Sequence, residues 1–314
     1  MQPPANSPMA HRPAPVSSAR ASARIRRLAD GAAPYGYLAP ALLILGLFQL
    51  APILYVIWLS FHKDTSFFGS AWVGVANYRR MAQDPEVGSA LAATLKFMIG
   101  TVPVSTLIAL GLALLLFEKL PGISAFRVIV LLPFITPVVA TTVVWQWIFN
   151  AQYGFLDSLL YWLHLPTVEW FTSPFWAMIV LVAYTIWHEA GFTVLIMLAG
   201  LTNIPRELKE SAQIDGANAP SRFLHITLPL MGPWIFFVLV INVIGSFQVF
   251  TQVLTLTQGG PDRSTTIAGF LIEQTAFQFF DLPYAAAIST AVLVVVSVLT
   301  VLQFLIGNRR VFYQ

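Results

Sequence analysis

Acidic and amide side chains inside long hydrophobic stretches are the groups in this sequence best suited to chemistry. Glu189 is the single acidic residue deep in such a stretch, and His188 directly precedes it. An ionisable group at membrane depth costs about 2.5–3.5 kcal/mol to insert and is therefore a candidate for function. Three placements fit Glu189: the lining of a solute pathway, a hydrogen bond or ion pair between helices, and a position near the inner lipid headgroups.

Amide side chains on a neighbouring stretch could face the same space. Gln248 and Gln252 are four residues apart, which places them on one face of a helix, whereas Asn242 lies six residues before Gln248 and off that face. Amides beside aromatic rings suit a neutral, hydroxylated solute such as a sugar. The same amides also form hydrogen bonds between packed helices, and each one alone fits that role. As a set we expect substrate ligands at Asn242, Gln248, Gln252, Glu189 and Phe250.

Motifs for catalysis are missing from the sequence. It contains no HExxH, GxSxG or Walker A pattern. The five histidines are scattered, and the lack of cysteine excludes disulfides, zinc–thiolate sites and thiol nucleophiles. We therefore expect a chain that is not an enzyme, binds no cofactor or metal and cannot split ATP by itself. An integral-membrane enzyme would need converging acid, base or metal ligands, and none converge.

Membrane spans must position these side chains. Hydrophobic residues make up 57% of the chain and charged residues 10%, against about 25% charged residues in soluble domains. A hydrocarbon core of about 30 Å requires roughly 20 apolar residues per helix. We expect an all-α integral membrane protein with six transmembrane helices, at residues 37–60, 91–116, 128–149, 175–200, 231–254 and 285–306.

The distribution of Lys and Arg predicts the orientation of these spans. Most of the 17 basic residues fall in cytoplasmic segments if the N-terminus is inside, as the positive-inside rule requires. Residues 1–34 are expected to form a disordered, basic cytoplasmic tail. The six-helix domain then covers residues 35–310, and residues 311–314 form a cytoplasmic C-terminus.

Residues 150–174 form an outer segment in this topology. Trp162, Trp170 and Phe171 occur there beside Asp157 and Glu169, as expected of a helix in the membrane interface. The tryptophans fit an aromatic belt, and they equally fit a docking surface for a soluble binding protein.

A polar stretch from Glu210 to Pro233 separates the fourth and fifth hydrophobic segments. Pro205 suits the start of a first helix, and Gly216 supplies the backbone freedom for a turn. Pro220 can open a second helix, which should end before Pro229. We expect a helix–turn–helix hairpin outside the membrane.

This stretch closely resembles the "EAA" signature of permease subunits in binding-protein-dependent ABC importers, most closely the sugar and glycerol-phosphate branch of maltose-transporter type. The matching residues are Glu210-Ser211-Ala212, Asp215-Gly216-Ala217, Phe223, Ile226, Leu228-Pro229 and Pro233. Ser211 stands where alanine is usual. Two weaker matches are Gly74, Asn77 and Tyr78 with a "GLxNY" element after the first span, and residues 256–265 with a "TxGGP" outer loop.

The resemblance implies a type I ABC importer permease fold in a bacterial cytoplasmic (inner) membrane, with both termini cytoplasmic. It implies that the loop 203–229 is a coupling helix that docks on an ATPase through Glu210, Ser211, Ala212, Asp215, Gly216 and Ala217. The implied partners are a second homologous permease, two ATPase subunits that bind ATP and Mg, an extracytoplasmic solute-binding protein and membrane lipid, with no nucleic acid. The implied function is sugar import. Import of glycerol 3-phosphate or a glycerophosphodiester is the alternative, and an ion-coupled secondary transporter is the alternative from another class.

Overall fold

A computed structural model describes residues 37–65, 69–118 and 121–307. The basic tail at 1–34, the C-terminus at 311–314, and Lys119, Arg309 and Arg310 lie outside the described residues. The chain divides into two compact units, residues 1–55 and 56–314. The first helix runs from Tyr37 to Leu59 and contains the π-helical turn η1 (Gly46–Leu50) and α2 (Ala51–Leu59), which confirms the predicted first span.

The segment after the first span forms a β-hairpin. Strand β1 (His62–Thr65) pairs antiparallel with β2 (Gly69–Trp72), with His62 opposite Trp72, and helix α3 (Ala76–Gln83) follows. Asn77 Nδ2 donates to the carbonyls of Ser60 (2.9 Å) and His62 (2.8 Å). Asn77 of α3 thus donates hydrogen bonds to backbone carbonyls at the start of β1, which stabilises the short β-hairpin.

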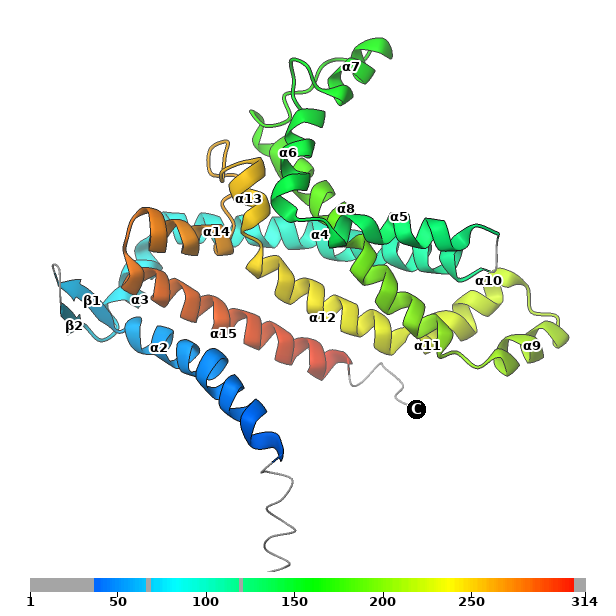
Figure 1. The fold of residues 1–314 in the computed structure, drawn as a ribbon, viewed down its shortest axis with the longest axis horizontal. Helices are drawn as coiled ribbons and strands as arrows, with labels where there is room; N and C mark the ends of the chain where they lie inside the picture. The colour runs from blue at the N-terminus through cyan, green and yellow to red at the C-terminus, as the bar shows by residue number, and fades with distance from the viewer. Residues whose placement is uncertain (1–36, 66–68, 119–120, 308–314) are drawn as a thin grey trace, which may run out of the picture. The chain divides into compact units, whose positions relative to one another are not determined.

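Three further spans are single helices that agree with the predicted ones: α4 (Pro85–Phe117), α8 (Pro174–Thr202) and α15 (Leu282–Gly307). Helix α4 is the central element, because it packs against α8, α12 and α14. Figure 1 shows the β-hairpin (β1 and β2) and α3 at one end of α4, and α9 and α10 at the other.

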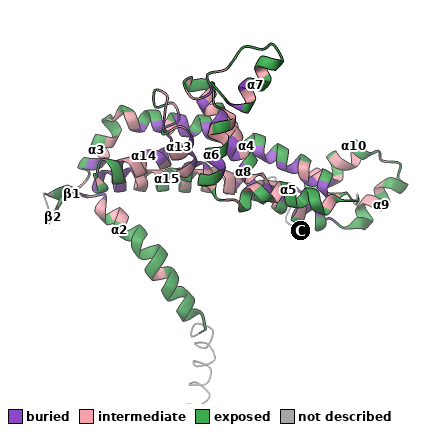
Figure 2. Ribbon diagram, turned by 45° about the horizontal axis from the view of Figure 1, so that its top comes forward, coloured by how far each residue is buried: buried purple, intermediate pink, exposed green. Residues whose placement is uncertain are grey.

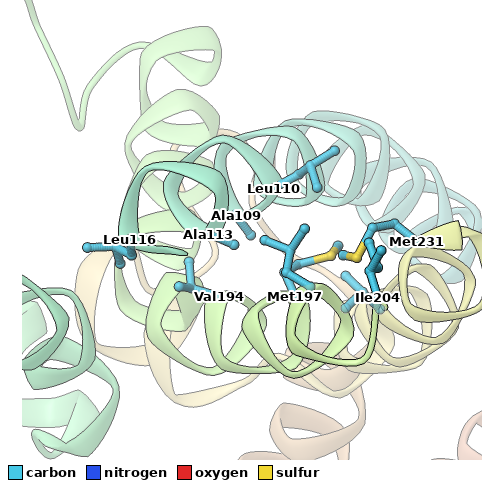
Figure 3. Packing of buried hydrophobic residues seen from close by; sticks show 10 residues of the cluster. Ala109, Leu110, Ala113, Leu116, Val194, Met197, Ile204 and Met231 are labelled. Carbon is cyan, nitrogen blue, oxygen red and sulfur yellow. The ribbon is translucent and has the colours of Figure 1, made fainter. Parts of the chain in front are cut away.

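The core between α4 and α8 is built from small and flexible side chains. Ala109 and Ala113 of α4 are fully buried and face Val194 and Met197 of α8, while Met197 and Met231 point toward one another (Figure 3). Alanine lets two helix backbones approach closely, which is the usual basis of helix packing in lipid. Figure 2 shows buried residues along the facing sides of these helices and exposed ones on their outer sides.

The third predicted span is not a straight helix. Helices α5 (Ile123–Ile135) and α6 (Val138–Ile148) meet at an angle of 99°. Pro137 has no N–H to donate and forces the preceding residue out of the helical region, and Thr136 accordingly has a ψ of 139°. The prediction of one helix at 128–149 is therefore wrong at its centre.

The fifth predicted span is also interrupted. Helix α12 (Gly232–Gln248) ends before Val249, which has a ψ of 126°, and α13 begins only at Thr251. The prediction of a single helix at 231–254 is wrong for this reason. At its other end α12 is bent by 61° against the helical segment Ala219–Leu230. The described residues thus have four helices long enough to span a membrane, or up to six if each bent pair is one span.

The remaining elements are short. They are α7 (Phe155–Trp162), α9 (Arg206–Ile214), α10 (Ala219–Arg222), η2 (Phe223–Thr227), α11 (Leu228–Leu230), α13 (Thr251–Leu256), α14 (Ala268–Glu273) and η3 (Gln274–Gln278).

Candidate functional site

The two broken spans meet, since α6 and α13 pack side by side (Figure 1). Gln146 of α6 donates from Nε2 to the backbone carbonyl of Thr255 and lies 3.4 Å from that of Leu256. These carbonyls belong to the last turn of α13 and have no partner within the helix. One amide side chain therefore closes the end of α13 and joins the two helices, α6 and α13, that follow the breaks.

Helix α8 supplies hydrogen bonds to the break in the third span. The Tyr184 hydroxyl donates to the Val138 carbonyl (3.2 Å) and lies 2.7 Å from the Thr141 hydroxyl, and His188 Nε2 lies 3.2 Å from the Thr136 carbonyl. Polar backbone away from a regular helix is tolerated at membrane depth only where protein or a water-filled cavity surrounds it. Tyr184 and His188, four residues apart on one face of α8, provide that surrounding protein.

Aromatic rings pack beside this break. The Trp145 ring lies 5.4 Å from those of both Tyr184 and Trp187, and 5.1 Å from that of Phe149. Tyr184 is fully buried, whereas Trp187 is exposed. The breaks are thus bordered by aromatic surface that continues to the outside of the chain.

Two of the predicted ligands lie on helices that reach these breaks. Glu189 directly follows His188, is partly buried, and forms no ion pair with any residue in the described ranges. Asn242 of α12 donates from Nδ2 to Ser105 Oγ of α4 (3.1 Å). Asn242 therefore links α12 to α4, whereas the Glu189 carboxylate forms no ion pair that links α8 to another described helix.

The predicted shared face of Gln248 and Gln252 does not exist. Gln248 is the last residue of α12 and is exposed, whereas Gln252 lies on α13 and is only 8% exposed. The backbone changes direction between them at Val249 and at Phe250, which has φ −142° and ψ −58°. Phe250 itself lies at the break, with its ring 6.4 Å from that of Phe270.

The polar stretch forms the expected helix–turn–helix hairpin. Helix α9 ends in a Schellman motif: Gly216 N–H donates to the Gln213 carbonyl (3.1 Å) and Ala217 N–H to the Ala212 carbonyl (2.9 Å). Gly216 has a φ of +78°, which the motif requires. Asn218 then caps α10 by accepting from Ser221 N–H (2.9 Å). Glu210, Ser211 and Asp215 are exposed, while Ala212 and Ala217 are partly buried.

The prediction that the second helix ends before Pro229 is wrong. Residues Phe223–Thr227 form a π-helical turn in which Leu228 N–H donates to the Phe223 carbonyl. This wider turn shifts the hydrogen bonds by one residue ahead of Pro229, which then lies in the first turn of α11. The helical path therefore continues from the hairpin to α12.

Lys209 connects the hairpin to the end of α4. Its Nζ lies 4.7 Å from the centre of the Phe117 ring. Burial lowers the pKa of Lys209 from its ordinary value, and the nearby Glu118 carboxylate opposes that shift. A cation over an aromatic face is attracted to it. This contact therefore links α9 to the end of α4. No pattern in the sequence predicted the contact between Lys209 and Phe117.

Charged residues join the elements at the opposite end of α4. Arg80 Nη1 contacts Asp281 Oδ2 at 2.6 Å, Arg263 pairs with Glu86, and the Tyr284 hydroxyl donates to Asp84 Oδ2 (2.7 Å). Arg263 belongs to the loop 256–265, where Gly259 has a φ of +81° and Gly260 N–H donates to the Thr257 carbonyl (2.9 Å) in a tight turn. The elements held together here are α3, α4, this loop and α15.

A helical bundle whose interrupted spans meet at polar and aromatic residues, with a water-exposed hairpin at one end, defines a membrane permease subunit. The chain belongs to the family described as binding-protein-dependent transport system inner membrane component, whose model matches residues 105–311. The matched residues include both broken spans and the helix–turn–helix hairpin of α9 and α10.

Relatives match nearly the whole chain. It is 33% identical to the trehalose/maltose transport system permease protein MalF of Thermococcus litoralis, over 88% of this chain and 95% of that protein. It is 32% identical to the sn-glycerol-3-phosphate transport system permease protein UgpA of Pectobacterium atrosepticum, over 90% of this chain and 96% of that protein. The fold matches a chain in the crystal structure of a bacterial ABC transporter for alginate import, with a TM-score of 0.79, 24% identity, and coverage of 90% of this chain and 99% of that one. The type I permease fold is thereby confirmed.

Proposed function

We propose that this chain is the permease subunit of an ATP-driven importer that carries a mono- or oligosaccharide inward across the cytoplasmic membrane by alternating access. The observation that carries the proposal is that α6 and α13, the helices that follow the two breaks, are joined by Gln146 and lie beside the Trp145–Trp187 aromatic surface. Two spans that break together offer polar backbone and side chains inside a bundle. A change in their packing can then expose them to either side.

A neutral solute fits the residues at the breaks. Helices α6, α8, α12 and α13 contain no Lys or Arg, and a buried phosphate would need such a partner. Gln252, Phe250 and Glu189 offer hydrogen-bonding groups and an aromatic face, which suit hydroxyl groups and the C–H surface of a sugar. One relative is a permease protein of an sn-glycerol-3-phosphate transport system, so import of that anion or a glycerophosphodiester is the alternative.

The substrate role of the glutamines is tested by Gln248→Ala and Gln252→Ala. Each variant should lower the initial rate of sugar uptake several-fold and raise the apparent KM, because a hydrogen bond to the solute is lost. Basal ATPase activity of the purified complex should not change. Gln274→Ala, on η3, is the matched control and should transport normally. Unchanged uptake kinetics in both α12 and α13 variants would remove these residues from the site.

The proposed partners follow from the same argument. A second homologous permease would complete the pathway, an extracytoplasmic binding protein would deliver the solute, and two ATPase subunits that hold ATP and Mg would contact the hairpin. The exposed Glu210, Ser211 and Asp215 offer a polar docking surface, and Gly216 sets its shape. Both termini would be cytoplasmic.

The orientation is tested by cysteine labelling, which a cysteine-free chain permits. Asp262→Cys in the loop after α13 should react with an impermeant maleimide added to intact cells. Gln213→Cys on α9 should react only after the cells are opened. Both positions are exposed in the described structure. Labelling of Gln213→Cys from outside would overturn the orientation.

A further inference from the structure

Helix α14 packs against the break in the fifth span. It begins after the loop 256–265 and contacts α4, α12 and α13 (Figure 1). Three consecutive residues at its start, Ala268, Gly269 and Phe270, make one contact each. Each contact fixes α14 to a different part of the chain.

Ala268 links α14 to the central helix α4. Its N–H belongs to the first turn of α14, where backbone donors have no acceptor within the helix. Thr94 Oγ1 of α4 accepts from this N–H at 2.9 Å, and the same hydroxyl donates to the Ala90 carbonyl at 2.7 Å. Thr94 is fully buried and Ala268 is 2% exposed. Because bulk water does not reach this N–H, the threonine hydroxyl alone fixes the start of α14.

Gly269 and Phe270 lie against the break itself. A Cβ added at Gly269 would be 2.5 Å from the Val249 carbonyl oxygen and 3.1 Å from the Phe247 carbonyl oxygen. Any side chain at this position would therefore push the broken backbone away from α14. The buried Phe270 ring stacks on that of Phe250, with an angle of 19° between the ring planes. The start of α14 thus sets the position of the backbone where α12 ends.

We propose that Thr94 is a positioning residue for solute binding, which acts through α14 on the break at residues 249–250. The inference rests on the proposed function, because that function assigns solute binding to Phe250 and Gln252. Both residues lie next to the break, on or beside the six-residue helix α13. Binding groups on such a short element keep their geometry only if neighbouring elements hold them. Thr94 provides this support from α4 and makes no contact with the solute.

Thr94→Val tests the proposal, because valine has nearly the shape of threonine but lacks the hydroxyl. Hydrogen exchange of the amides in residues 247–257 of the purified complex should become about tenfold faster, since the buried Ala268 N–H loses its acceptor. The apparent KM for the labelled sugar that the unmutated complex transports should rise several-fold. The maximal uptake rate and the abundance in the membrane should stay near native. Thr94→Ser keeps the hydroxyl and should give native exchange and a native KM.

Thr106→Val is the matched control. Thr106 is also buried on α4, but its hydroxyl donates to the Val102 carbonyl of the same helix (2.7 Å). This variant should change neither the exchange of residues 247–257 nor the KM. Gly269→Ala, which displaces the break from α14, is the second variant if Thr94→Val is not inserted into the membrane. The same outcomes apply to it.

Two results would overturn the proposal. Unchanged exchange in Thr94→Val would mean that Thr94 does not hold the break. Faster exchange with an unchanged KM would mean that the held break does not set the affinity for the solute. Exchange is measured without solute or ATP, so it reports on Thr94 even if the proposed function fails. Such a failure appears separately, as a lack of ATP-dependent sugar uptake by the unmutated complex.

Discussion

Replacing Gly216 by valine should abolish most transport while the permease remains folded and abundant in the membrane. Gly216 closes the Schellman motif of α9 with a φ of +78°, a conformation that a β-branched residue adopts only at a cost of order 1–3 kcal/mol. A Cβ here would meet no atom within 4 Å, so the effect is confined to the backbone. The hairpin would change its shape, and the proposed contact with the ATPase would be lost. Uptake assays and quantitative immunoblots of membranes measure the two quantities.

Gly216→Asn is the matched control, because asparagine tolerates the left-handed region better than other residues with a side chain. It should retain much more transport than Gly216→Val. Glu210→Lys should resemble the valine variant, since it reverses the charge on the exposed face of α9 without altering the backbone. If the valine and lysine variants both transport normally and respond to the loaded binding protein, the hairpin is only a connector.

Replacing Gly191 by alanine should destabilise the whole bundle. A Cβ at this position would lie 2.8 Å from the Val130 carbonyl oxygen and 2.9 Å from Leu131 Cα. These are backbone atoms of α5, so α5 and α8 would have to separate next to the His188–Thr136 contact. Overpacking of this kind costs about 1–3 kcal/mol. The midpoint of thermal unfolding of the detergent-purified protein should fall by several degrees, and transport should fall with it.

Gly245→Ala provides the comparison within another span. Nothing lies within 4 Å of its added Cβ, and alanine favours helices over glycine. Its thermal midpoint should stay the same or rise. Equal midpoints for Gly191→Ala and Gly245→Ala would mean that α5 and α8 do not pack as closely as the structure has them.

The spans and the hairpin could be predicted because each depends on local sequence. Apolar length sets a membrane helix, and Gly216 followed by Asn218 and Pro220 sets a turn and a new helix. The family followed from the same residues, because the "EAA" stretch is one continuous segment.

The breaks and their partners could not be predicted in the same way. Pro137 alone does not predict the break, because prolines are tolerated in membrane helices that neighbouring helices surround. The bend of 99° depends on Tyr184 and His188, which lie more than 40 residues later in the sequence. The contact of Gln146 with Thr255 joins residues 109 positions apart. Because the fifth span breaks at Val249, helical spacing placed Gln248 and Gln252 together when they lie on separate helices.

Reconstituted transport tests the central claim most directly. The chain, purified with the subunits that accompany it, would be placed in proteoliposomes with ATP enclosed and supplied with the binding protein and labelled sugars. We predict that at least one mono- or oligosaccharide accumulates inside only when ATP and the binding protein are both present, and that the loaded binding protein stimulates ATP hydrolysis. Accumulation driven by a proton or sodium gradient without ATP, or ATP-dependent uptake of glycerol 3-phosphate but of no sugar, would contradict the account.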